Sequence, residues 1–260
     1  MGIIYNDGFV RSSRRVVDPI PALLPYVYLM SGDYLLNGSN AAQWNDSSGN
    51  NRHAVQPGVY YLSSLAVITN SMKGNSVLRS VGGNQYMTLG AYFASANGYT
   101  FMVVVRNTDL QTDNTPVNGV FGLANNYYRI ITTFGGVGGT GNVSHFTQTN
   151  NTIDAAIYED SSIPAGTIAV YIIRWVATSL VVYKNGVLIG SVTTQNSNKM
   201  PNSAYLRLGQ RYGTLVVGSP YGHLWRDSLI GDIAEFAMWR RGLTTQEITT
   251  VSNYEINKFI

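Results

Sequence analysis

The sequence predicts an all-β protein, a two-sheet antiparallel sandwich with one short C-terminal helix. About a dozen short apolar stretches are separated by turn signals, a pattern typical of such sandwiches. Asn185-Gly186, between two apolar stretches, is the strongest hairpin signal in the chain. Thr-Thr-Gln-Glu at residues 244–247 is a capping box that marks the start of the helix.

Composition limits the kind of protein. The chain has 260 residues, a length at which β-sandwiches are commonly single domains. Charged residues make up 12%, roughly half the usual share, and cysteine is absent, which excludes disulfides and thiolate zinc sites. The net charge is +3 without a basic stripe interleaved with aromatics, so nucleic-acid binding is not expected. No apolar run could insert in a membrane and no signal peptide is recognised, so we expect synthesis in a cytoplasm without export.

Residues 1–27 are predicted to form an extended N-terminal arm, and residues 28–260 the sandwich domain. Prolines between residues 19 and 25 prevent a continuous helix. The apolar residues of the arm are Val16, Val17, Ile20, Leu23 and Leu24. An extended apolar segment can add to the sheet edge of a neighbouring chain, so the arm is a candidate anchor. A disordered arm is the alternative interpretation.

The expected strands cover residues 26–36, 60–68, 77–78, 99–106, 117–123, 127–134, 153–158, 167–176, 180–184, 187–192, 206–210 and 233–239. The unbroken apolar run at 99–106 predicts a central strand with both faces buried. Asn125-Asn126 favours a hairpin turn between its two neighbouring strands. The glycine-rich stretch 135–141 lacks the Lys-Ser/Thr of a phosphate-binding loop and is expected to be a plain loop.

The last strand, residues 233–239, should be covered on both sides because Glu235 is its only charged residue. Strict alternation assigns Ala234, Phe236 and Met238 to one face and Ile233, Glu235 and Trp239 to the other. Gly242 is expected to break the strand.

The helix that follows begins at Thr244, with Glu247 reaching back to close the capping box. Leu243 and Ile248 occupy the two positions of a hydrophobic staple. Ile248, Val251 and Tyr254 follow at helical spacing and predict the inward stripe.

Three segments carry a resemblance to a known family. They are IGDIAEFAMWRRGLTTQEI at the C-terminus, Trp44–Ala54, which contains Asp-Ser-Ser-Gly-Asn, and the hairpin Tyr183–Val187. Together they resemble laminin-G-like, concanavalin-A-like jelly rolls over about residues 28 to 260. The resemblance implies a jelly-roll sandwich. It does not choose a function, because this fold hosts lectins, glycosidases and structural modules.

Enzymatic activity is not expected. The hydrolases of the family carry Glu-x-Asp-x-x-Glu or Glu-x-Asp-x-Glu on one strand, and this chain has neither pattern. Its nearest run is Asp232-Ile-Ala-Glu235, whose odd spacing predicts side chains on opposite faces. His53, His145 and His223 lie in no recognisable nucleophile motif.

The resemblance also implies a calcium site at Asp46, with help from Asp232. Asp46 lies in a loop of Asn, Ser and Gly residues, and calcium needs six to eight oxygen ligands. The alternative is that Asp46 and Asn50 only brace the turn through hydrogen bonds to the backbone.

Sugar binding would need aromatic rings that stack on a pyranose, together with amide and guanidinium donors. Two loops offer them. The candidate ligand-binding residues are Tyr127, Tyr128, Arg129, Arg211, Tyr212, Tyr221, His223 and Trp225.

These observations lead to one functional expectation. The chain is a non-enzymatic structural protein of a bacteriophage virion, either a capsid decoration protein or a tail or fibre accessory. Its arm would dock on other virion proteins or on sister subunits, and its sandwich would face outward toward a host-surface glycan. A free-standing lectin and a glycoside-active enzyme of the same fold are the alternatives.

Overall fold

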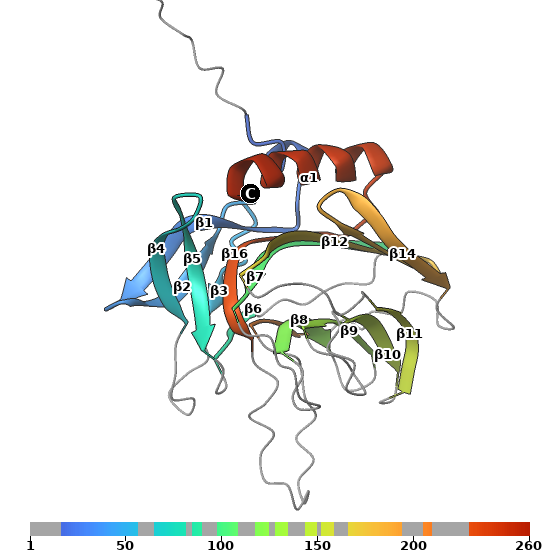
Figure 1. Cartoon of the computed structure of the whole chain (residues 1–260), viewed down its shortest axis with the longest axis horizontal. Coiled ribbons are helices and arrows are strands. Elements are labelled where there is room, and N and C mark those ends of the chain that lie inside the picture. Colours follow the sequence, from blue (N-terminus) through green and yellow to red (C-terminus); the bar gives the residue numbers. More distant parts are fainter. Residues whose placement is uncertain are drawn as a thin grey trace, which may run out of the picture.

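The computed structural model of the chain describes residues 17–56, 65–81, 85–89, 98–108, 118–124, 128–134, 144–149, 152–158, 166–193, 205–209 and 229–260. Within these ranges the chain forms sixteen strands and one α-helix at the C-terminus, which confirms the predicted class (Figure 1). All strand pairs recorded in this part of the chain are antiparallel. No helix in these ranges is long and apolar enough to cross a bilayer.

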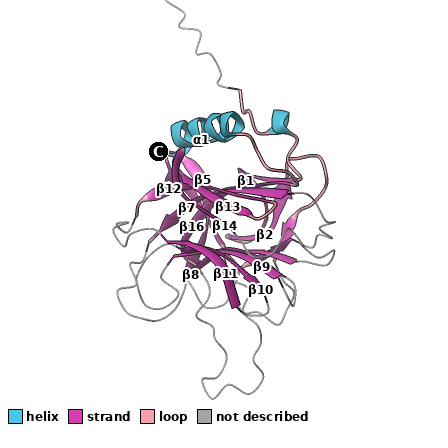
Figure 2. Ribbon diagram, turned by 90° about the vertical axis from the view of Figure 1, so that its right-hand side faces the viewer, coloured by secondary structure: helices cyan, strands magenta, loops and turns pink. Residues whose placement is uncertain are grey.

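The strands form two layers. One layer is centred on β7 (Gly98–Asn107), β12 (Ile168–Val176), β13 (Ser179–Lys184), β14 (Val187–Thr193) and β16 (Ile230–Trp239). The opposite layer contains β6 (Met87–Leu89), β8 (Asn118–Ala124), β9 (Tyr128–Phe134), β10 (Ser144–Thr149), β11 (Thr152–Tyr158) and β15 (Tyr205–Leu208). The remaining strands are β1 (Val27–Asn37), β2 (Asn40–Asp46), β3 (Ala54–Val55), β4 (Ala66–Met72) and β5 (Asn75–Val81). Helix α1 (Thr245–Phe259) lies across the outer face of the first layer (Figures 1 and 2).

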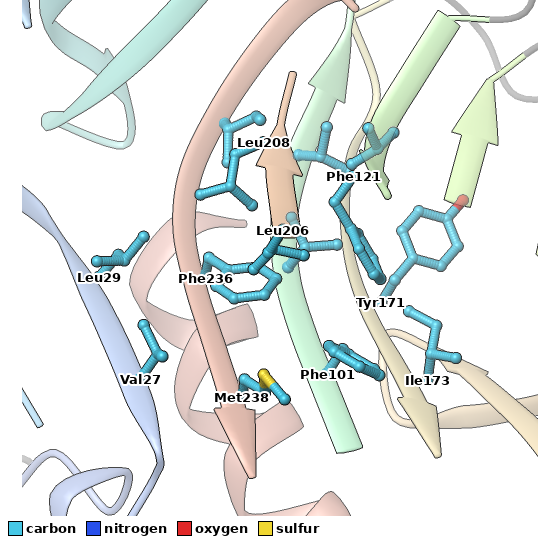
Figure 3. Packing of buried hydrophobic residues seen from close by; sticks show 14 of the residues in the cluster. Val27, Leu29, Phe101, Phe121, Tyr171, Ile173, Leu206, Leu208, Phe236 and Met238 are labelled. Atoms are coloured by element: carbon cyan, nitrogen blue, oxygen red, sulfur yellow. The ribbon is translucent and has the colours of Figure 1, made fainter. Parts of the chain in front are cut away.

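The inner core fills the space between the two layers. The ring of Phe121 lies 5.4 Å from that of Phe101 and 5.7 Å from that of Phe236, so aromatic side chains of three strands meet at its centre (Figure 3). A second, outer cluster lies between the first layer and α1 and includes Met102 and Val104 of β7. Because β7 contributes to both clusters, the predicted central strand with two buried faces is confirmed.

Strand β16 is buried on both sides, as predicted, but it does not alternate regularly. Ile233 pairs with Val105 and Glu235 with Val104, so Ala234 is an extra residue in the strand. This β-bulge reverses the alternation that follows it. Ile233, Phe236 and Met238 therefore face the inner core, whereas Ala234, Ala237 and Trp239 face the outer cluster. The predicted face assignment, which placed Ala234 with Phe236 and Met238, is wrong for this reason.

The local signals around α1 are confirmed. The Glu247 backbone N–H donates to Thr244 Oγ1, and the Thr244 N–H donates to the Glu247 carboxylate, which completes the capping box. Leu243 and Ile248 are both buried in the outer cluster, as a hydrophobic staple requires. Val251 follows them inward, while Tyr254 is only half-buried.

The Asn185-Gly186 hairpin is also confirmed. Its two residues have φ angles of 49° and 78°, the positive pair that a tight turn between twisted strands requires. The Asn185 side chain accepts a hydrogen bond from the Val170 N–H at 2.8 Å, which attaches the turn to β12. The Asn125-Asn126 turn lies outside the described residues, although the strands on either side of it do pair.

Part of the predicted arm packs on the sandwich. Ile20 is fully buried in the outer cluster, just before the short 3-10 helix η1 (Pro21–Leu23). The Asp18 carboxylate accepts hydrogen bonds from the Ile20 N–H at 2.9 Å and from the Tyr28 hydroxyl at 2.7 Å. Val17 and Leu24 remain exposed. Residues 1–16 lie outside the described part, and the domain boundary stays a prediction.

Two carboxyl groups are sealed between β16 and α1. Glu235 and Glu255 are both fully buried. Glu235 accepts a hydrogen bond from the Ser31 N–H at 3.1 Å and pairs with the Lys258 ammonium, which is the cation of this group. Burial, followed by the charge of Glu235, raises the pKa of Glu255 well above its usual value. Burial therefore favours the protonated form of Glu255, which removes the repulsion between the two groups.

The stability of the protein should decline through Glu255 as the pH rises above about 4.5, the ordinary pKa of a glutamate. A raised folded-state pKa means that its contribution is complete below the unfolded pKa of about 4.5 and is lost as pH rises toward the folded pKa. The free energy of unfolding should fall by up to about 1.4 kcal/mol per pH unit in that window. Glu255→Gln, which stays neutral, should flatten this decline in urea titrations measured across the pH range.

Glu247→Gln is the matched control on the same helix. The ion pair with Arg241, and then the bonds to Thr244, lower the pKa of Glu247 to about 2, so its contribution is present above about pH 4.5 and is lost only as pH falls toward 2. This control should retain the decline above about pH 4.5. An equal decline above about pH 4.5 in Glu255→Gln and the wild type would show that Glu255 does not hold the proton.

Candidate functional site

The Asp46 loop is bound tightly to the start of β1. The Asp46 carboxylate accepts hydrogen bonds from the backbone N–H groups of Tyr28 at 2.9 Å, Ser48 at 3.0 Å and Arg52 at 2.8 Å, and from the Ser48 hydroxyl at 2.8 Å. The Asn50 amide donates to the carbonyl oxygens of Pro25 and Tyr26, both at 3.2 Å. Asp46 and Asn50 thus make the turn-bracing contacts that were the alternative to a calcium site.

This loop places an arginine over a tyrosine at the surface. The Arg52 guanidinium carbon lies 3.9 Å from the centre of the Tyr26 ring, and that of Arg240 lies 5.1 Å from the same centre. All three side chains are partly exposed. Both distances are within the range of cation–π attraction. We call Tyr26, Arg52 and Arg240 the arginine–tyrosine cluster, and it is the candidate site in the described part of the chain.

The cluster was not predicted from the sequence. Arg52 belongs to the Trp44–Ala54 segment and Arg240 to the closing segment, which are far apart in the chain. Their approach depends on the pairing of β1 with β16, in which the Tyr26 N–H donates to the Met238 carbonyl at 2.7 Å. The sequence contains no local signal for that register.

The predicted sugar-binding residues cannot be assembled into a site. Tyr128 and Arg129 begin β9, where only the backbone is described. The other six lie outside the described residues: Tyr127, Arg211, Tyr212, Tyr221, His223 and Trp225. Their role stays a prediction.

Asp232 is a buried carboxylate at the centre of an ion cluster. It lies opposite Arg79 of β5 and Arg106 of β7, so the three side chains share one face of the sheet. Arg79 donates to both carboxylate oxygens, through Nε at 2.7 Å and Nη2 at 3.0 Å. Arg106 donates through Nε at 2.9 Å and also through Nη2. Two guanidinium groups therefore compensate one fully buried carboxylate.

The two aspartates predicted to share a calcium ion are not brought together. Leu29 pairs with Asp46 on one side and with Phe236 on the other, and Asp232 lies four residues before Phe236. Strand spacing and rise separate the two carboxylates by more than about 10 Å, whereas calcium holds its oxygens at about 2.3–2.6 Å. In the described ranges no three His, Cys, Asp or Glu side chains form a metal-binding group. Calcium at either aspartate alone stays a prediction.

Asp232 and Glu235 do not project to opposite faces, as the spacing suggested. The bulge at Ala234 turns Glu235 to the outer side, where it meets Lys258 of α1. Asp232 faces the same side with its two arginines. Both carboxylates are fully buried, so neither is exposed to a substrate.

Comparisons with known proteins agree with this architecture. The sequence model of the Concanavalin A-like lectin/glucanases superfamily matches residues 81–249. Domain 4 of AbnA, a GH43 extracellular arabinanase from Geobacillus stearothermophilus in complex with arabinotriose, is 18% identical with a TM-score of 0.59, covering 87% of this chain and 97% of that one. No curated protein sequence matches the chain.

Receptor-binding domains of botulinum neurotoxin share the fold as well. The serotype D binding domain is 14% identical with a TM-score of 0.61, over 89% of this chain and 51% of that one. A serotype D ligand-binding domain in complex with N-acetylneuraminic acid is 13% identical with a TM-score of 0.59, with the same coverage of this chain and 51% of its own. The chain thus spans about half the length of these toxin domains.

Removing the Asp46 carboxylate should destabilise the fold. Asp46→Ala leaves the N–H groups of Tyr28, Ser48 and Arg52 without their acceptor, so the free energy of unfolding should fall by about 2–4 kcal/mol in urea titrations. Asp33→Ala is the control, because in the described part of the chain the donors to Asp33 are the side chains of Asn45 and Ser47 rather than backbone N–H groups. Equal losses in the two variants would contradict the central role of Asp46.

The wild type and Asp46→Ala also distinguish turn bracing by Asp46 from calcium binding. Because the Asp46 oxygens are already engaged, addition of calcium or of a chelator should leave the unfolding midpoint unchanged. A bound ion would instead raise the midpoint with calcium concentration. A calcium-dependent rise that disappears in Asp46→Ala would establish the calcium site and refute the bracing role.

Proposed function

We propose that this chain, which belongs to the Concanavalin A-like lectin/glucanases superfamily, is a non-enzymatic glycan-binding protein carried on the surface of a bacteriophage virion. The observation that carries the proposal is a contrast among the described side chains. The carboxylates that lie on β16 are buried and engaged, whereas guanidinium groups and a tyrosine are grouped at the surface. Such a surface suits recognition of a ligand better than its cleavage.

Two solved structures of this fold support a sugar as the ligand. One is the arabinanase domain in complex with arabinotriose, and the other is the neurotoxin domain in complex with N-acetylneuraminic acid. Those ligands belong to those proteins, which are less than 20% identical to this chain. They make a glycan the first class of ligand to test here.

The buried acids argue against the glycoside-active alternative. Glycosidases use two carboxyl groups that flank the scissile bond, about 5 to 9.5 Å apart depending on mechanism. In the described part of the chain, Glu235 and Glu255 are neighbouring carboxyl groups, but both are fully buried between β16 and α1. Asp232 is neutralised by Arg79 and Arg106. None of these groups can reach a polysaccharide without loss of the outer cluster.

Display on a virion is supported by the N-terminal segment and the composition. Ile20 anchors the described start of that segment in the outer cluster beside α1, and sixteen residues precede Val17 in the sequence. They include Arg11, Arg14 and Arg15. A low charged fraction of 12% and the absence of cysteine suit a capsid decoration protein or a tail or fibre accessory. Other virion subunits or sister copies are the proposed partners of this segment.

Binding without cleavage is the first expected outcome. The protein should bind members of an immobilised glycan array yet release no reducing ends from β-glucans, galactans or host-wall polysaccharides, because Asp232, Glu235 and Glu255 are buried. Release of reducing ends that is lost in both Glu235→Ala and Asp232→Ala would overturn the non-enzymatic assignment, provided that both variants remain folded.

Deletion of residues 1–16 should separate attachment from folding. This truncation keeps Ile20 and Asp18, so its unfolding midpoint should match that of the full chain while its co-sedimentation with purified virions, or its self-association, is lost. Deletion of residues 1–27 is the comparison, since it also removes buried Ile20 at a cost of about 2–3 kcal/mol. Unchanged assembly after deletion of residues 1–16 would refute the anchoring role.

A further inference from the structure

We infer that the arginine–tyrosine cluster is the subsite that receives the acidic group of an acidic sugar, so that the glycan bound by this protein carries carboxylates. This inference rests on the proposed glycan binding and assigns its chemistry. Arginine is suited to the role because its planar fork can bind both oxygens of a carboxylate.

The ring of Tyr26 holds the guanidinium groups in place. Arg52 lies 3.9 Å and Arg240 5.1 Å from the ring centre. A guanidinium that already rests on an aromatic ring loses less rotamer freedom when it binds an anion than a freely moving one. Tyr26 is therefore a positioning residue. Because Arg52 lies over the ring, a ligand meets guanidinium donors here instead of the bare aromatic face on which a neutral sugar would stack.

The backbone beneath the cluster is fixed from both sides. The Arg52 N–H donates to Asp46 and the Asn50 amide holds the carbonyls of Pro25 and Tyr26. On the other side, the Tyr26 N–H is bonded to Met238, one residue before the end of β16. Three separate segments thus fix the cluster before any ligand arrives, as a binding site requires.

Arg52 also differs from Arg79, Arg106 and Arg241 in its electrostatic setting. Arg79 and Arg106 share Asp232, and Arg241 pairs with Glu247. Within the described ranges Arg52 makes no ion pair, and the nearby Asp46 carboxylate already accepts from four donors. Its positive charge is therefore available to a ligand. The net charge of +3 favours approach of an anionic polymer.

The test is calorimetric titration of the full chain with a galacturonic acid oligosaccharide, dextran sulfate and a neutral arabinan oligosaccharide. The wild type should bind the galacturonate probe most tightly, and more weakly as salt is raised. Arg52→Gln and Arg240→Gln should each weaken that binding by roughly tenfold or more. Tyr26→Phe should keep the affinity because it keeps the ring, whereas Tyr26→Leu should lower it.

Lys184→Gln is the matched control. It removes one positive charge that also lies over a tyrosine, at 5.8 Å from the ring of Tyr171. This charge belongs to β13 and not to the arginine–tyrosine cluster. Its affinity for galacturonate should equal that of the wild type, and the unfolding midpoints of Arg52→Gln and Arg240→Gln should be unchanged.

The failures of the inference and of the proposed function are distinguishable. Binding of neutral glycans that persists in Arg52→Gln, without any binding of galacturonate, overturns the inference and leaves the proposed function standing. Equal affinity for dextran sulfate and galacturonate overturns the carboxylate assignment. Absence of binding to every glycan on an array overturns both.

Discussion

Burial of the β16–β7–β12 layer on both faces is the constraint on which the rest of the structure depends. One face packs against the opposite layer through Phe101, Phe121 and Phe236, and the other packs under α1. In a sheet that is buried on both faces, an unpaired charge would cost a large desolvation free energy. Asp232 therefore has two arginines, and Glu255 shares its surroundings with Glu235 and Lys258.

The same constraint separates the acids from the surface. The carboxylates on β16 stabilise the fold from within, so they are not available as catalytic groups. The arginine–tyrosine cluster lies at the end of the layer, where β1 pairs with β16 and the Asp46 loop is hydrogen-bonded to the start of β1. Membership in a superfamily of lectins and glucanases does not show whether a chain binds a glycan or cleaves it. The placement of the charged groups is what favours recognition.

Features set by neighbouring residues could be predicted from the sequence. The capping box at Thr244 and the positive φ angles at Asn185 and Gly186 need only a few residues each, and both were found as expected. The bulge at Ala234 could not be predicted, because it depends on how β16 pairs with β7 rather than on its own sequence. The arginine–tyrosine cluster depends on three distant segments meeting, which no single motif contains. The residues proposed from aromatic composition, such as Tyr221 and Trp225, lie where the structure gives no description.

The central claim is that the junction of β1, the Asp46 loop and the end of β16 binds an acidic glycan. The most direct measurement is NMR mapping of backbone amide shifts while a galacturonic acid oligosaccharide is added to the full chain. The account predicts that the largest shifts cluster at Tyr26, residues 48–53 and Arg240 and saturate with the ligand. Saturating shifts confined to other parts of the domain, or no shifts at all, would contradict it.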